Sequence, residues 1–132
     1  MKQDISVLIL TFNEEPHIER CIKSLQPFTE DIFIVDSYST DKTVVIAESL
    51  GAKVYQNKWV NYAVQYQWGL DNCPIETKWV MRMDSDEYIL PELVEEINTK
   101  INMIDDETSG IYIKRRVRFM GRWIKHGSYY PI

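Results

Sequence analysis

Short apolar runs alternate with segments of helical periodicity along most of this chain. Residues 5–10 and 32–35 are continuous apolar runs, as expected of strands that are buried on both faces. Between them, over residues 16–25, apolar side chains recur at helical spacing. Strands that alternate with helices are joined by crossovers, which make neighbouring strands parallel. We therefore predict the α/β class, with a doubly wound, mostly parallel sheet and helices on both faces.

Local signals set the predicted boundaries of these elements. Pro16 can open a helix without the loss of a hydrogen bond, and Ser39 or Thr40 is a suitable N-cap for a second helix that Gly51 ends. The predicted strands are residues 5–10, 32–35, 52–55 and 78–83, with one or two more over 110–124. Further helices are predicted over residues 61–71 and from Pro91 to about residue 103.

Length and composition restrict the class of protein. The 132 residues suffice for a single domain, 1–132, and 45% hydrophobic with 27% charged residues is typical of a folded chain. The net charge of −5 argues against general nucleic-acid binding. No apolar run approaches the roughly 20 residues of a membrane helix, and the polar start has no signal-peptide pattern. We expect a cytoplasmic protein, and structural roles for Cys21 and Cys73.

Two carboxylates follow the apolar run 78–83 directly. Asp84 and Asp86 are one residue apart, so their side chains would point the same way if the extended backbone continued. Both would then leave the sheet at its carboxyl edge, where open α/β sheets bind ligands. Carboxylate oxygens favour Mg²⁺ or Mn²⁺, and an isolated solvated turn is the alternative interpretation.

Two other polar turns follow predicted strands, at residues 11–15 and 36–41. In a doubly wound sheet these turns and residues 84–86 share one edge, so they converge on one cleft. Clustered carboxylates repel one another unless a cation or hydrogen-bond donors accompany them. No glycine-rich phosphate loop occurs in the sequence, so a bound diphosphate would need a metal ion to neutralise much of its charge.

Residues 7–15, 34–43 and 81–87 together resemble glycosyltransferase family 2, which has the Rossmann-like GT-A fold. Residues 114–131 are similar to a bacterial branch with lipopolysaccharide-core and capsule glycosyltransferases. The resemblance implies a nucleoside pocket and a metal site. The implied nucleotide-sugar-binding residues are Thr11, Asn13, Glu14, Asp36, which would accept from the uracil ring, and Asp84, beside the ribose; the implied metal ligands are Asp86 and Asp84.

The implied activity is metal-dependent, inverting transfer of a sugar from a nucleotide sugar, a UDP-sugar, to a saccharide or lipid-linked acceptor in cell-surface polysaccharide synthesis. The cofactor would be Mn²⁺ or Mg²⁺. Family members are typically longer and place their general base after the metal motif, whereas no acidic residue follows Glu107 here. The chain is therefore a fragment that lacks most of the acceptor half, or its base is unusual. Glu87 and His126 are the candidates for the base, although both residue types are more often structural or exposed.

Two other functions stay open. One is a nucleotide-sugar-binding module without transferase activity, and the other is a Mg²⁺-dependent phosphoryl-transfer or receiver-type domain with Asp36 as its nucleophile. Four aromatic residues around 61–71 could pack in the core, the commoner environment, or stack on a sugar or base. They are Trp59, Tyr62, Tyr66 and Trp68. The basic segment 114–123 could meet an anionic lipid-linked acceptor or the inner face of the membrane, or form a solvated sheet edge.

Overall fold

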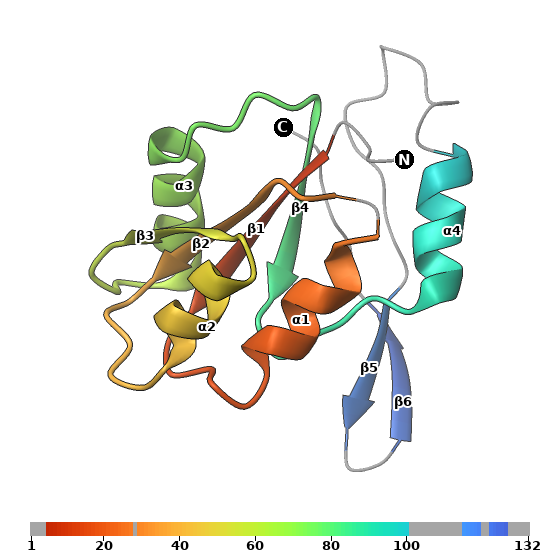
Figure 1. The fold of residues 1–132 in the computed structure, drawn as a ribbon, viewed down its shortest axis with the longest axis horizontal. Coiled ribbons are helices and arrows are strands. Elements are labelled where there is room, and N and C mark those ends of the chain that lie inside the picture. The colour runs from red at the N-terminus through yellow and green to blue at the C-terminus, as the bar shows by residue number, and fades with distance from the viewer. Residues whose placement is uncertain (1–4, 28, 101–114, 120–121, 127–132) are drawn as a thin grey trace.

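The structure is a computed structural model that describes residues 5–27, 29–100, 115–119 and 122–126, with side chains described up to residue 99. Strands and helices alternate through the first hundred residues (Figure 1). In chain order the elements are β1 (Ile5–Thr11), α1 (Ile18–Leu25), β2 (Ile32–Asp36), α2 (Thr43–Ser49), β3 (Lys53–Gln56), α3 (Tyr62–Asn72), β4 (Trp79–Asp84), α4 (Pro91–Lys100), β5 (Arg115–Phe119) and β6 (Arg122–His126).

Four strands form one parallel sheet in the order β3-β2-β1-β4. In the central pairs, Leu8 of β1 lies opposite Phe33 of β2 and opposite Arg82 of β4. Because all four strands run the same way, their carboxyl ends lie at one edge of the sheet (Figure 1). The predicted α/β class and parallel sheet are confirmed.

The two faces of the sheet pack against different helices. Val7 and Ile9 of β1 point into a core shared with α1, α2 and α4. Leu8, between them, points to the opposite face and packs with residues of α3. Side chains that alternate along a strand therefore fill two cores, which explains why β1 and β2 are apolar throughout. Helices on both faces were predicted, and this prediction is also confirmed.

Helix α3 approaches the sheet closely at one position. A Cβ atom on Gly69 would lie 2.9 Å from a methyl carbon of Leu8 and 2.9 Å from one of Val35. Both of those sheet side chains are fully buried. The absence of a side chain at this position lets the helix lie against β1 and β2, and so sets the height of its first turn above the sheet edge.

Some predicted boundaries were wrong by a few residues. Helix α1 begins at Ile18 rather than at Pro16, because the carbonyl of Glu14 first accepts the amides of His17 and Ile18 in a turn. The N-cap of α2 is Lys42 and not Ser39 or Thr40. The strands predicted over 110–124 correspond to β5 and β6, which pair antiparallel. Within the described ranges, no helix combines the length and apolar character that a bilayer crossing requires.

Candidate functional site

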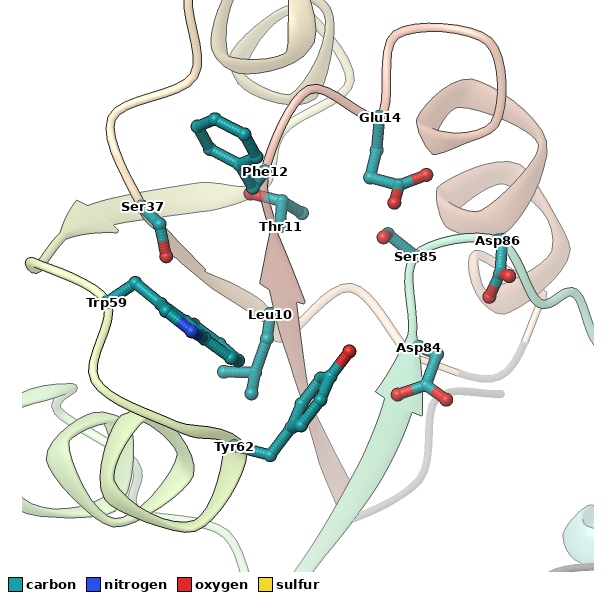
Figure 2. Close-up of a pocket in the computed structure, with 10 residues that line it drawn as sticks. All are labelled: Leu10, Thr11, Phe12, Glu14, Ser37, Trp59, Tyr62, Asp84, Ser85 and Asp86. Carbon is teal, nitrogen blue, oxygen red and sulfur yellow. The ribbon is translucent and has the colours of Figure 1, made fainter.

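A pocket of about 520 Å³ opens at the carboxyl edge of the sheet (Figure 2). Its walls come from the ends of β1, β2 and β4, and from the segment that joins β3 to α3. This is the edge at which the sequence placed a ligand cleft. The described lining residues are Leu10, Thr11, Phe12, Glu14, Ser37, Trp59, Tyr62, Asp84, Ser85 and Asp86.

The turns after β1 and β2 are bonded to each other. The amide of Asn13 donates to Ser39 Oγ at 2.8 Å, and Asn13 Oδ1 accepts the Thr40 amide at 2.8 Å. Glu15 does the same one step along the chain: its amide donates to Asp41 at 3.2 Å and its carboxylate accepts the Lys42 amide at 3.0 Å. The polar side chains of these two turns therefore mainly hold the turns together.

Asp36 is the fixed centre of the second turn. It is fully buried, and its two carboxylate oxygens accept from four donors, of which the Thr11 hydroxyl at 2.7 Å and the Ser39 amide at 2.8 Å are the shortest outside the Ser39 hydroxyl. The fourth donor is the Gln56 side chain at 3.3 Å. Neither Asp36 nor Asn13 lines the pocket, whereas Thr11 and Glu14 do. Their assignment to a nucleoside remains a prediction.

The third turn carries the two carboxylates that open into the pocket. The strand ends at Asp84, and the Glu87 amide donates to the Asp84 carbonyl at 3.0 Å, so the backbone turns before Asp86. The expectation that extended geometry would aim both side chains the same way was therefore wrong in its reason. Asp84 and Asp86 nevertheless both line the pocket, from either side of the buried Ser85 (Figure 2).

Helix α1 holds the backbone of this third turn at three points. Arg20 donates to the Asp86 carbonyl at 3.2 Å, and its guanidinium lies 4.4 Å from the centre of the Tyr88 ring. The Cys21 thiol lies 3.8 Å from the Asp84 carbonyl oxygen. Ser24 Oγ accepts the Ile89 amide at 3.0 Å. The position of the acidic turn thus depends on a helix that the motif itself does not include.

The thiol of Cys21 reports the electrostatic environment of this turn. Burial raises its pKa well above the ordinary value, and the nearby carboxylates of Glu87, Asp86 and Asp84 raise it further, while Arg20 acts in the opposite sense. Three acidic groups and one permanent cation therefore surround the same short segment. A cation bound in the pocket would meet a net negative field.

The residues fit a divalent cation whose coordination a ligand completes. In the part of the chain with described side chains, no three His, Cys, Asp or Glu residues are grouped so as to hold a metal ion by themselves. Mg²⁺ is commonly held by one or two carboxylates together with substrate phosphates. Asp84 and Asp86 supply two carboxylates, and neither accepts a hydrogen bond or ion pair from another described residue. Such a pair suits a metal that arrives with phosphates.

Neither predicted candidate for a general base lies free in the pocket. Glu87 turns back on its own loop, where its carboxylate accepts the Asp84 amide at 2.8 Å. This bond makes Glu87 a residue that shapes the acidic turn. His126 is the last residue of β6, and its side chain lies outside the described part of the structure.

The wall opposite the acidic turn is aromatic. Trp59 and Tyr62 remain 42% and 62% exposed and line the pocket, whereas Tyr66 and Trp68 pack against the core beneath α3. Core packing, the commoner environment for such residues, therefore holds for two of the four. Sequence reasoning also passed over Phe12, although it lies between two residues of the first turn motif and lines the pocket.

The family model described as "Glycosyl transferase family 2" matches residues 6–130. An uncharacterized glycosyltransferase of Rickettsia bellii is 42% identical over 97 residues, which are 74% of this chain and 32% of that protein. The lipopolysaccharide core biosynthesis glycosyltransferase LpsC of Rhizobium meliloti is 32% identical over 125 residues, 91% of this chain and 45% of that protein. This chain thus spans less than half the length of either relative.

Solved structures agree with this assignment. The crystal structure of S. aureus TarS, residues 1–349, superposes with a TM-score of 0.64 at 29% identity, over 78% of this chain and 33% of that one. Glucosyl-3-phosphoglycerate synthase from Mycobacterium tuberculosis, in complex with UDP, superposes with a TM-score of 0.64 at 23% identity, over 84% and 45% of the two chains; this second likeness concerns the fold alone. The parallel sheet, the pocket at its carboxyl edge and the match over nearly the whole chain lead to one conclusion: the chain belongs to glycosyltransferase family 2, with the GT-A fold.

Proposed function

We propose that this chain forms the donor site of a metal-dependent glycosyltransferase that takes a sugar from a nucleotide sugar, specifically a UDP-sugar. The observation that carries the proposal is the pair Asp84 and Asp86, two carboxylates that open into one pocket and receive no donor from the described residues. The relatives' names and the UDP complex of one structural neighbour support the choice of donor.

The reaction explains why carboxylates lie where phosphates must bind. When the sugar leaves, negative charge grows on the β-phosphate, and a bound Mn²⁺ or Mg²⁺ supplies positive charge that stabilises the transition state more than the ground state. Asp86 and Asp84 would hold this ion. Thr11 and Glu14 would contact the nucleoside from the β1 side, while Asn13 and Asp36 would act by fixing the two turns that shape that wall.

The acceptor belongs to the same proposal. A saccharide or lipid-linked acceptor in cell-surface polysaccharide synthesis is consistent with the name of the Rhizobium meliloti relative. Inversion at the sugar requires a base that removes the proton of the acceptor hydroxyl from the face opposite the leaving group. Because Glu87 is bonded to the Asp84 amide, we do not assign it this role.

That engagement of Glu87 favours a second candidate function, a nucleotide-sugar-binding unit that transfers nothing by itself. It predicts metal-dependent UDP binding without product when UDP-glucose and an acceptor are supplied. A receiver-type phosphoryl-transfer domain is disfavoured, since its nucleophilic Asp36 would have to be accessible and is instead fully buried under four donors. Acetyl phosphate should therefore leave Asp36 unmodified.

Calorimetric titration of UDP into the full chain tests the donor site. Binding should occur with Mn²⁺, disappear with EDTA, and fall at least tenfold in Asp86→Ala, as expected when one of two protein ligands of a metal is lost. Asp71→Ala is the matched control, because Asp71 is an exposed acid on α3 whose bond is to Gln67. Equal binding by the Asp86 and Asp71 variants, or undiminished binding in EDTA, would contradict the proposal.

A further inference from the structure

The aromatic wall of the pocket suggests how the far end of the donor is held. Trp59 and Tyr62 form an edge-to-face pair, with ring centroids 4.8 Å apart and an interplanar angle of 87°. Both rings line the pocket and both are substantially exposed. A pair of large rings that already pack on each other, yet keep open area in a pocket, has the form of a platform for a flat ligand group.

The platform is held in place from both ends of the segment that carries it. At one end, the Gln65 side chain donates to the Asn57 carbonyl at 3.0 Å and accepts from the Asn57 side chain at 3.0 Å. At the other end, Asn61 caps α3 by accepting the Val64 amide at 2.8 Å. Gln65 is fully buried and also donates to Ser37 at 3.0 Å, which ties this segment to the turn after β2. Trp59 therefore lies on a braced segment.

The topology of the sheet separates this platform from the acidic turn. With the strand order β3-β2-β1-β4, the segment after β3 and the turn after β4 lie on opposite sides of β1. Figure 2 shows the same arrangement: Trp59 and Tyr62 lie across the pocket from Asp84 and Asp86, with Leu10 between the two groups. A ligand that spans the pocket must present a group for carboxylate-bound metal at one end and a flat apolar group at the other.

We propose that Trp59, supported edge-on by Tyr62, stacks on the nucleobase of the donor. The inference rests on the proposed function, which places the diphosphate at Asp84 and Asp86. In a nucleotide sugar the base and the transferred sugar lie at opposite ends of the diphosphate, so the end that extends from the metal toward Trp59 over β1 carries the base. Stacking uses the ring face that every base has, so it supplies affinity with little selection among bases.

The test compares two ligands on three proteins. UDP carries the base, and pyrophosphate carries only the charged end; both are titrated with saturating Mn²⁺ into wild type, Trp59→Ala and Val60→Ala. Loss of base stacking should weaken UDP binding by Trp59→Ala about 5- to 100-fold, while its affinity for pyrophosphate stays at the wild-type value. Val60 is the matched control, since it is a neighbouring residue, 64% exposed, that does not line the pocket. Trp59→Phe, which keeps a ring, should recover most of the affinity.

The outcomes separate this inference from the proposed function. If wild type binds UDP with Mn²⁺ and Trp59→Ala binds it equally well, the stacking platform is wrong and the donor site stands. If Trp59→Ala loses pyrophosphate as strongly as UDP, the residue acts on the metal end or on folding, and the inference is again overturned. If wild type binds neither ligand, the donor site itself fails, and the platform fails with it.

Discussion

Arg20 should control the affinity of the acidic turn for its metal ion, although it supplies no ligand. Its guanidinium donates to the Asp86 carbonyl and lies over the Tyr88 ring, so it joins α1 to the segment that carries Asp86. Arg20→Met keeps a similar apolar stem and removes both contacts. We expect weaker Mn²⁺-dependent UDP binding, because the turn must then be ordered when the ion binds.

Two opposing effects set the size of this change. An exposed charge-assisted hydrogen bond and a surface cation–π contact together contribute about 1.5–2 kcal/mol, which corresponds to a loss of about 10- to 30-fold in affinity. Removal of a positive charge near the carboxylates favours the incoming cation, but in a water-like dielectric at about 8 Å this gain is only about 0.5 kcal/mol. The loss of order should therefore dominate, and Arg20→Lys, which keeps the charge without the planar fork, should fall between the two.

The assay is a Mn²⁺ titration at fixed UDP, with a thermal melt of each variant to verify folding. Lys23→Met is the matched control, because Lys23 lies on the same helix and pairs only across an exposed surface with Glu19, at 3.2 Å. High salt should enlarge the defect of Arg20→Met by screening the charge effect. If Arg20→Met bound Mn²⁺ as tightly as wild type or more tightly, electrostatic repulsion would be the main role of Arg20 and the reasoning would be refuted.

Three further predictions concern stability. Gln65→Leu should lower the free energy of unfolding in urea by about 2–4 kcal/mol, because buried partners of Gln65 lose their bonds, whereas the exposed change Gln67→Leu should alter it by less than about 0.5 kcal/mol. Gly69→Ala should cost about 1 kcal/mol by the same measurement, since overpacking against the sheet exceeds the gain in helix propensity; a stabilised variant would contradict this. Burial raises the pKa of Cys21, and raises that of Cys73 to about 11, so both thiols should react slowly with a disulfide reagent at pH 8 until urea unfolds the chain. Because the unfolded thiols ionise near pH 9.0, the stability gained by keeping them protonated is complete below that pH and is lost as the pH rises above it, which urea midpoints at pH 8 and pH 10 would show.

The sheet could be predicted because its signals are local. Residues 5–10 are apolar at every position, which only a strand buried on both faces requires, and the structure places Leu8 and Ile9 on opposite cores. The order of the strands and the shared edge follow from general rules for parallel crossovers. Boundaries were less predictable, since the start of α2 depends on which turn partners Ser39 and Thr40 take.

The walls of the pocket were only half predictable, for a different reason. Asp84 and Asp86 stood out because two charges follow an apolar strand. Trp59 and Tyr66 are both aromatic residues around the same helix, and nothing in their spacing says that the first lines the pocket while the second packs on the core. That difference arises from how α3 lies on the sheet, which contacts such as those of Gly69 determine.

The distribution of hydrogen-bond donors among the three polar turns decides which of them can bind a cation. The sequence suggested that all three converge as an acidic cluster in need of a metal ion. In the structure, Asp36, Glu15 and Asp41 already accept backbone or side-chain donors from the paired turns after β1 and β2. Their charge is thus offset within the protein, and Asp84 and Asp86 are left to attract an ion from outside. Two turns that satisfy each other build a rigid wall, and one turn that does not supplies the chemistry.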